Sequence, residues 1–180
     1  MHDLSKLLKN ARTLYAAGDL KQAKFHFEKV LKQKPKNAEA LHLNGIIAFQ
    51  LGQYKKAISS IKKALKIDTQ NFDMCNNLGL ILQTIGDIQK AEYYYKRAIV
   101  LNNLLPQAHY NLGNLQKDQQ HYHEAIVSYQ NAIKINKDYI DAYTNMSQTY
   151  NFIYEYQNAK KYASHAISLN PSFFIAYQNL

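Results

Sequence analysis

Cysteine and long apolar stretches are scarce in this sequence of 180 residues, and each shortage excludes a class of protein. The single cysteine, Cys75, excludes an internal disulfide and any metal site built from several cysteines, and it fits a reducing compartment. The longest apolar runs, such as residues 79–82 and 173–176, fall far short of the roughly 20 residues that a membrane-spanning helix needs. The first ten residues contain no uninterrupted apolar region and no small-residue cleavage site. We therefore expect a cytoplasmic protein with neither a secretory signal nor a membrane span.

Acidic residues are scarce only in the first part of the chain. Residues 1–71 carry 14 Lys and Arg against 5 Asp and Glu, whereas residues 72–180 carry 8 of each. A basic half can indicate binding to nucleic acid or to an acidic partner. Many of its lysines, however, recur at helical spacing, as on a solvated helix face: Lys55, Lys56, Lys62, Lys63 and Lys66. We interpret them as a solvated surface and expect no nucleic-acid binding.

An internal repeat of 34 residues organises the chain. One series of alanines keeps this interval without a slip: Ala23, Ala57, Ala91, Ala125 and Ala159. Glycines repeat in two further registers, at 45, 79 and 113 and at 18, 52 and 86. A period of this length indicates stacked copies of one supersecondary unit, because a single copy cannot bury its own apolar face.

Each repeat is predicted to contain two helices. In the third, the apolar residues of 72–83 follow a helical period, Gly86 and Asp87 interrupt it, and residues 88–101 resume it. Two antiparallel helices approach closely where small residues meet, so we expect Gly79 of the first helix to face Ala91 of the second. The fold is therefore predicted to be all-α.

The signature positions resemble the tetratricopeptide repeat (TPR) family. The second repeat carries them in residues 38–45 and 52–54 and in Ala57 and Ala64, and the likeness extends from about residue 4 to residue 170. The resemblance implies a right-handed α-α superhelical solenoid forming a single domain. We divide it into five full units at about 4–37, 38–71, 72–105, 106–139 and 140–173, with a partial sixth at 174–180. Departures occur at Gln120, Ser147 and Tyr154, where glycine is usual.

The end of the chain is unusually apolar for a terminal repeat, which normally has a polar outer face. Phe173, Phe174, Ile175, Tyr177 and Leu180 give it this character. We expect either a fragment of a longer chain or self-association through this end.

A polar series stands out against the core pattern: Asn77, Asn111, Asn145 and Asn179 occupy one place in successive first helices. In the TPR family the first helices line a concave groove, and asparagines at this place resemble the ladder with which O-linked N-acetylglucosamine transferases hold a peptide backbone. The alternative is that asparagine is simply common at this position. Lys9 and Leu43 interrupt the series in the first two units. The predicted peptide groove also includes Asn76, Tyr110, Asn114 and Gln148.

The other candidate sites are weaker. The family's carboxylate clamp needs cations that no window of three units supplies. His121 and His123 point to different sides of a helix and lack a third ligand nearby, so no metal site is predicted. Cys75 is interpreted as a buried inert thiol and not a nucleophile. Most of the 15 tyrosines fit the core better than a stacking platform for single-stranded nucleic acid.

Function is therefore predicted to be binding and not catalysis. Our first hypothesis is a non-catalytic scaffold, without metal or cofactor, whose groove holds a protein or an extended peptide. The alternative is the substrate-recruiting N-terminal arm of a larger glycosyltransferase or sulfotransferase, because the array resembles the TPR region of bacterial O-linked N-acetylglucosamine transferase-like proteins. A third and weaker hypothesis is a solenoid that binds RNA or an acidic protein through its basic first two units.

Overall fold

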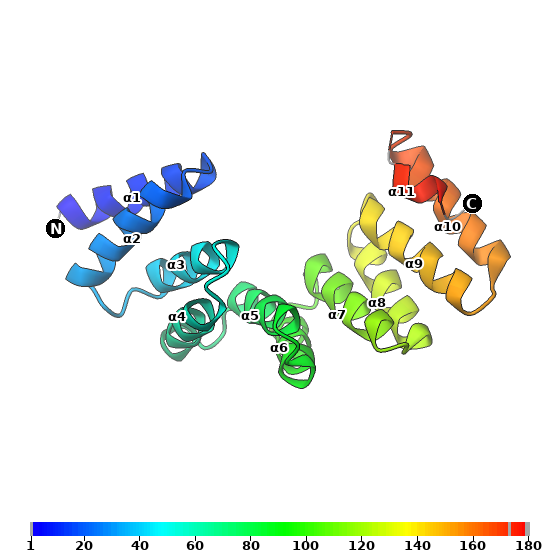
Figure 1. Ribbon diagram of the computed structural model, residues 1–180, viewed down its shortest axis with the longest axis horizontal. Coiled ribbons are helices and arrows are strands. Elements are labelled where there is room, and N and C mark those ends of the chain that lie inside the picture. The colour runs from blue at the N-terminus through cyan, green and yellow to red at the C-terminus, as the bar shows by residue number, and fades with distance from the viewer. Residues whose placement is uncertain (1, 173, 179–180) are drawn as a thin grey trace. The chain divides into compact units, whose positions relative to one another are not determined.

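Helices and turns form all of the structure in residues 2–172 and 174–178, which the computed structural model describes (Figure 1). No strand occurs in these residues. The helices are α1 His2–Ala16, α2 Leu20–Gln33, α3 Ala38–Gln50, α4 Tyr54–Ile67, α5 Phe72–Thr84, α6 Ile88–Leu101, α7 Pro106–Asp118, α8 Tyr122–Ile135, α9 Ile140–Phe152, α10 Tyr156–Leu169 and α11 Phe174–Tyr177. None of those described is both long and apolar enough to cross a membrane. The all-helical prediction is confirmed, including the helices expected at 72–83 and 88–101.

The first helices begin at capping residues that recur with the period. Asn37 Oδ1 accepts a hydrogen bond of 2.8 Å from the backbone N–H of Ala40, and Asn71 Oδ1 accepts one of 3.0 Å from Met74. Each cap satisfies one of the backbone donors that a helix N-terminus leaves unpaired. At the start of α7 the cap is replaced by Pro106, whose missing N–H needs no partner there.

The turns between paired helices require a left-handed residue. At the end of α3 the backbone N–H of Gly52 donates to Phe49 O, and that of Gln53 donates to Ala48 O, at 2.9 and 2.8 Å. This pair of bonds is a Schellman motif, in which the penultimate residue has a positive φ. Gly52 has φ 70°, while Gln120 and Tyr154 hold the same place with φ 63°. The repeat thus forces two residues with a Cβ atom into a conformation that favours glycine.

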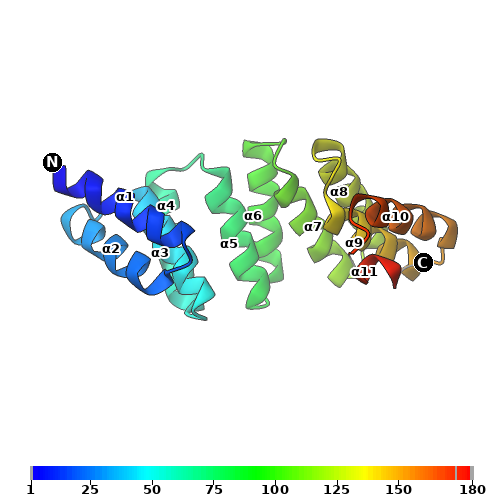
Figure 2. The same cartoon turned by 90° about the horizontal axis from the view of Figure 1, so that it is seen from above.

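Contacts group the chain into two compact units, Met1–Ala91 and Glu92–Leu180, and the division falls within α6. In the first unit α3 packs against α2, α4 and α5, and it lies beside α4 in both views (Figures 1 and 2). Phe27 and Ile47 are fully buried in this core among small alanines. The single domain of five repeats stays a prediction.

The core of the second unit is rich in tyrosine. Tyr129 is fully buried, and Tyr143 and Tyr150 are each 8% exposed. The rings of Tyr150 and Tyr162 stack with their centroids 5.5 Å apart. The expectation that most tyrosines serve the core holds for Tyr95 and Tyr129, which are fully buried, whereas Tyr93 is 56% exposed.

Two repeat glycines mark the closest approach between paired helices. A Cβ atom on Gly113 would lie 2.7 Å from Cε1 of Tyr129, and one on Gly45 would lie 2.7 Å from Cγ1 of Ile61 and 3.3 Å from the carbonyl oxygen of Ala57. The glycine therefore makes room for a large side chain of the second helix, Tyr129 or Ile61. The sequence had suggested that the glycine faces a small alanine instead. In the fifth repeat Ser147 takes this place and donates a hydrogen bond of 2.7 Å to the carbonyl oxygen of Ala159.

The apolar C-terminal end is described only in part. Ile175 is 54% exposed and Ala176 is buried. Phe173 and Leu180 lie outside the described residues, as do the side chains of Phe174 and Tyr177. Self-association through this end stays a prediction.

Replacing Gln120 by glycine should stabilise the protein. A left-handed residue with a Cβ atom costs about 1–2 kcal/mol, and the greater freedom of glycine in the unfolded chain returns part of the gain. We expect the free energy of unfolding, measured by urea denaturation, to rise by about 0.5–1 kcal/mol.

Gly52→Ala is the matched control, because nothing lies within 4 Å of the added Cβ atom and only the backbone is strained. It should lose about 1–2 kcal/mol. Equal stabilities of the parent and both variants would contradict this explanation of the turns.

Candidate functional site

Two polar rows face each other on the first helices of the second unit. On α7 the row is Tyr110, Asn114 and Lys117, and on α9 it is Asp141, Asn145 and Gln148. Each row has the spacing i, i+4, i+7, which places its side chains on one helix face. All except the exposed Asp141 are half-buried. We call these six residues the α7–α9 face.

Hydrogen bonds connect the two rows. Asn145 Nδ2 donates to Tyr110 Oη at 3.1 Å and to Asn114 Oδ1 at 2.8 Å. Lys117 Nζ donates to Gln148 Oε1 at 2.9 Å. Since an amide nitrogen has two hydrogens, both donors of Asn145 are used within the protein. Its carbonyl Oδ1 and the amide nitrogen of Gln148 make no hydrogen bond within the described part of the chain and are the groups that a ligand can use.

Aromatic hydroxyls support the rows from beneath. Tyr129 of α8 is fully buried, yet its Oη donates to Asn114 Oδ1 at 2.8 Å. The Tyr110 ring lies 5.0 Å from that of Tyr139 and 6.0 Å from that of Tyr129, between centroids. Burial raises the pKa of Tyr110 and Tyr129, and it raises the pKa of Tyr139 to about 12. The three phenols are therefore protonated at neutral pH; the Tyr129 hydroxyl donates to Asn114, and the Tyr110 hydroxyl accepts from Asn145.

Lys117 is the only cation among the six residues of the α7–α9 face. Burial lowers its pKa, partly offset by the nearby carboxylate of Asp118. Sequence reasoning missed this residue because the equivalent positions, Gln83 and Asn151, are uncharged. Lys117 lies seven residues after Tyr110, and this spacing would have placed it on the same helix face as the predicted groove residue.

The predicted groove residues fall in both units. Tyr110, Asn114, Asn145 and Gln148 come together on the α7–α9 face, and Asn111 is half-buried on α7. Asn76 and Asn77 are half-buried on α5 of the first unit. Asn179 lies outside the described residues. The assignment of these residues to peptide binding stays a prediction.

The first unit contains a contact at the same repeat offset. Asn77 Nδ2 lies 3.0 Å from His42 Nε2, and the two residues are 35 positions apart, as are Tyr110 and Asn145. An asparagine of the series thus binds the preceding first helix in each unit. Two members of the series, Asn77 and Asn145, thus have a structural role between first helices that the sequence did not suggest.

The candidate nucleophile Cys75 and the candidate metal ligands His121 and His123 lie on or beside helices α5 and α8. Cys75 is buried, as expected for an inert thiol. In the described residues no group of three or more His, Cys, Asp and Glu side chains could hold a metal ion. His121 is the residue that precedes α8, and His123 is exposed in its first turn.

Comparisons with known proteins decide the family. Models described as tetratricopeptide repeat match residues 14–74, residues 106–139, and residues 72–103 with 140–173. The chain belongs to the tetratricopeptide repeat family. TPR proteins are generally protein-interaction scaffolds, and this is the coarse function of the chain. A comparison with curated proteins gave no match.

Solved TPR structures share the fold. A crystal structure of MamA is 29% identical with a TM-score of 0.80, and the match covers 89% of this chain and 94% of that chain. YrrB, described as a TPR protein with an unusual peptide-binding site, is 23% identical with a TM-score of 0.76, over 96% of this chain and 89% of that one. PilF of Pseudomonas aeruginosa is 18% identical with a TM-score of 0.83, over 98% and 88%. The predicted TPR solenoid is confirmed.

His42 should make stability depend on pH. Burial lowers its pKa, partly offset by Asp73 and Glu39, so the folded protein binds the proton less readily than the unfolded chain. The free energy of unfolding should therefore decrease as pH falls through about 6.5, the ordinary pKa of histidine, and level off below the folded-state pKa. Urea denaturation at a series of pH values between about 7.5 and 5.5 measures the decrease.

The His42→Gln variant should show a smaller decrease over this range, because glutamine does not titrate. His123→Gln, at an exposed histidine of α8, is the control and should keep the parent profile. An unchanged decrease in His42→Gln would mean that another group is responsible.

Proposed function

We propose that the chain is a non-catalytic scaffold that binds an extended peptide across the α7–α9 face. The observation that carries the proposal is a pair of polar groups on α9 that no described residue engages, the Oδ1 of Asn145 and the amide nitrogen of Gln148. One is an acceptor and the other a donor. Together they match the N–H and C=O that an extended peptide presents at each residue.

The spacing of the first helices suits such a peptide. Packed helices lie about 8–10 Å apart, and an extended strand advances about 3.3 Å per residue. Asn111 of α7 and Asn145 of α9 hold the same repeat position, so they would meet peptide residues about three positions apart. Because the contacts are made to the backbone, the face should accept many sequences.

Lys117 adds a preference to this broad recognition. Its ammonium group is desolvated and already positioned by Gln148, so it can pair with a carboxylate of the peptide. Asp141 of α9 is exposed in the other row, seven positions before Gln148. A peptide whose acidic group lies beside Lys117 should be preferred over one whose acidic group lies beside Asp141.

The alternative function is a substrate-recruiting arm of a glycosyltransferase or sulfotransferase. No contact of the α7–α9 face favours it over a scaffold, and it stays a hypothesis from the sequence. The cytoplasm remains the expected compartment, on the ground of the lone Cys75.

Replacing Asn111 and Asn145 together by alanine should weaken peptide binding. Each lost hydrogen bond contributes about 0.5–1.5 kcal/mol, so the dissociation constant should rise by roughly 5- to 100-fold. Peptides selected from a random library displayed on phage provide the ligands, and calorimetric titration measures their affinity. The loss should be similar for different peptides, since backbone groups are recognised.

The structural role of Asn145 calls for two controls. Tyr110→Phe removes one bond that orients Asn145 and leaves both carboxamides in place, so binding should weaken by only about two- to fivefold, less than in the asparagine pair. Asn131→Ala with Gln157→Ala removes two carboxamides from second helices. If Tyr110→Phe weakens binding as much as the asparagine pair does, or if the asparagine pair unfolds the protein, the series only connects helices and the proposal fails.

A further inference from the structure

A pocket with an apolar floor and a basic rim lies at the end of α4 in the first unit. Its volume is about 500 Å³. The lining comes from α3, α4 and the turn between α2 and α3: Pro35, Lys36, Leu41, Lys63, Lys66 and Ile67. We call it the inter-repeat pocket, and it shares no residue with the α7–α9 face.

Backbone hydrogen bonds fix the turn that forms one wall of the pocket. The backbone N–H of Asn37 donates to Lys34 O at 3.1 Å, and the side chain of Asn37 caps α3. These bonds hold Pro35 and Lys36 as the central residues of a tight turn. The other wall is the last turn of α4. Both walls are therefore in place before a ligand arrives.

The same six repeat positions form a pocket in the second unit. Each of its residues lies two repeat periods after its counterpart: Asn103, Leu104, His109, Asn131, Lys134 and Ile135. Lys134 is the only lysine among these six, whereas the inter-repeat pocket has three. The repeat geometry thus creates the pocket, and the basic rim distinguishes the copy in the first unit.

The floor of the inter-repeat pocket is apolar. Leu41 is 8% exposed, and Ile67, the last residue of α4, is 45% exposed. Pro35 adds a third apolar side chain. Covering such a surface removes apolar area from water, which is favourable. The floor therefore favours a ligand that carries an apolar group of its own.

Three exposed lysines surround this floor: Lys36, Lys63 and Lys66. No hydrogen bond or ion pair engages their side chains within the described part of the chain. The carboxylates nearest to them in sequence are engaged elsewhere. Glu39 pairs with Arg12, and Asp68 Oδ2 accepts a hydrogen bond of 2.9 Å from Asn71. The three ammonium groups can therefore pair with negative charges of a ligand.

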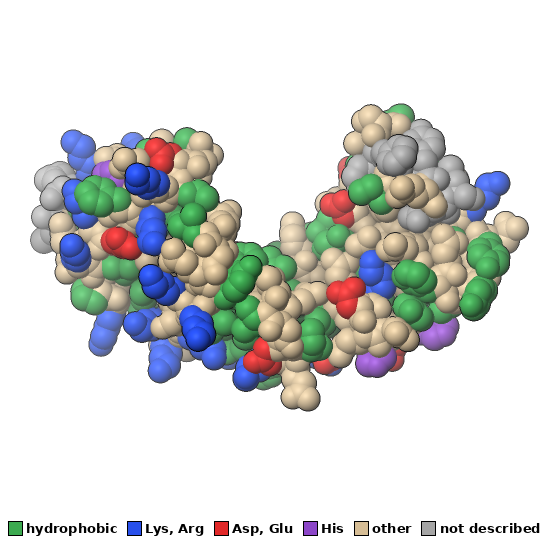
Figure 3. Space-filling view, in the orientation of Figure 1, with side chains coloured by type: hydrophobic (Ala, Val, Ile, Leu, Met, Phe, Trp, Pro, Cys, Tyr) green, Lys and Arg blue, Asp and Glu red, His purple; other side chains and the backbone are tan. Residues whose placement is uncertain are grey.

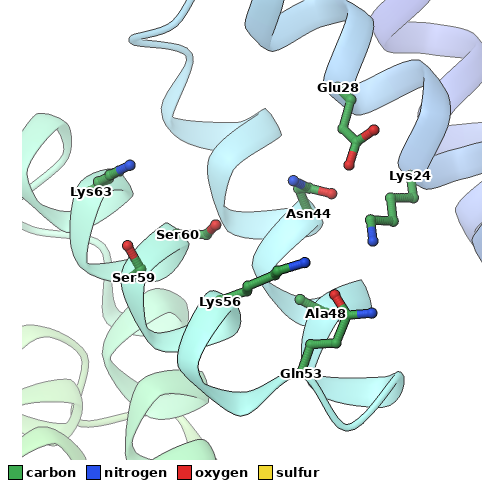
Figure 4. Close-up of a pocket in the computed structure, with 9 residues that line it drawn as sticks. All are labelled: Lys24, Glu28, Asn44, Ala48, Gln53, Lys56, Ser59, Ser60 and Lys63. Carbon is green, nitrogen blue, oxygen red and sulfur yellow. The ribbon is translucent and has the colours of Figure 1, made fainter.

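A polar cavity between α2, α3 and α4 adjoins the pocket and shares Lys63 with it (Figure 4). Two amide oxygens of its lining, Asn44 Oδ1 and Gln53 Oε1, accept no hydrogen bond from the described residues, but they are inaccessible to solvent and thus to a ligand. In Figure 4 Lys63 stands apart from Lys24 and Lys56. Those two lysines therefore serve as a control for the position of the charges.

The combination of an apolar floor and three cations restricts the ligand. Inorganic phosphate has no apolar group, and a fatty acid has one carboxylate for three lysines. Bases of single-stranded RNA stack on aromatic rings, and the six lining residues include none. We propose that the inter-repeat pocket docks a segment of a partner protein in which a large apolar side chain is flanked by acidic residues.

The charge of the surrounding surface favours the same partner. Lysine and arginine side chains gather over the first unit in Figure 3, and residues 1–71 hold the whole excess of positive charge. Such a surface raises the rate at which an acidic partner is encountered, and the effect weakens with salt. The proposal gives Lys63 and Lys66 a role beyond the solvated surface inferred from the sequence.

The test of the rim uses the intact protein and a fluorescein-labelled peptide with one leucine flanked on each side by two glutamates. Fluorescence polarisation measures its affinity. The double variant Lys63→Gln with Lys66→Gln should bind about 3- to 10-fold more weakly, because two ion pairs with exposed cations are lost. Lys24→Gln with Lys56→Gln removes the same charge outside the pocket and should lose less than about twofold.

The floor is tested on the ligand and on the protein. A peptide with serine in place of the leucine keeps all its charges and should bind about 5- to 20-fold more weakly. Ile67→Ser should weaken binding of the leucine peptide by about 3- to 10-fold and leave that of the serine peptide unchanged. The matched control is Ile85→Ser, at an isoleucine that is also 45% exposed but lies outside the pocket, and it should bind both peptides as the parent does.

Several outcomes would overturn the proposal. These are equal binding of the leucine and serine peptides, equal losses in the two lysine variants, or equal losses in the two isoleucine variants. Displacement of the peptide at constant ionic strength by phosphate, by laurate or by an oligouridine RNA would assign the pocket to a simple anion, a fatty acid or nucleic acid. The Asn111→Ala with Asn145→Ala variant should bind the leucine peptide as the parent does, so failure here is distinguishable from failure of the α7–α9 face.

Discussion

Close approach between the two helices of a repeat is the constraint on which the rest of the structure depends. The space left by Gly113 is occupied by the Tyr129 ring, and that left by Gly45 by Ile61. A helix pair of this kind buries one side only, so neighbouring pairs must cover the other. The apolar positions of a repeat make the contacts within its helix pair and the contacts with neighbouring pairs. The row of first-helix positions that we propose for recognition lies outside these apolar contacts.

In the proposed peptide site, polar residues of that row would serve two purposes at once. The amide nitrogens of Asn77 and Asn145 contact the preceding first helix, at His42 and at Tyr110. A hydrogen-bond donor spent in this way fixes the carboxamide and orients its oxygen, so the side chain loses little freedom when a ligand arrives. In the proposed peptide site, such a contact between helices would also prepare the asparagine for a ligand.

The helices could be predicted from the sequence because the period recurs in several registers, and the bounds of α5 and α6 agree with it. Asn114, Asn145 and Gln148 were found for the same reason. Two of their partners were not: Lys117 interrupts the repeat pattern, and the Tyr129 hydroxyl lies beneath it. The unpaired oxygens of Asn44 and Gln53 could not be foreseen either, because whether an amide finds a partner depends on three helices and not on one.

Tyr129 connects the interior with the surface, and this affects how the binding of variants at this position is interpreted. Its ring fills the space beside Gly113, while its hydroxyl reaches through the helix pair to Asn114. No ligand on the α7–α9 face can touch a fully buried ring. A mutational scan scored by ligand capture would nevertheless mark this core position as part of the recognition surface. Direct contact and indirect support are therefore inseparable in such a map, and only removal of the hydroxyl alone distinguishes them.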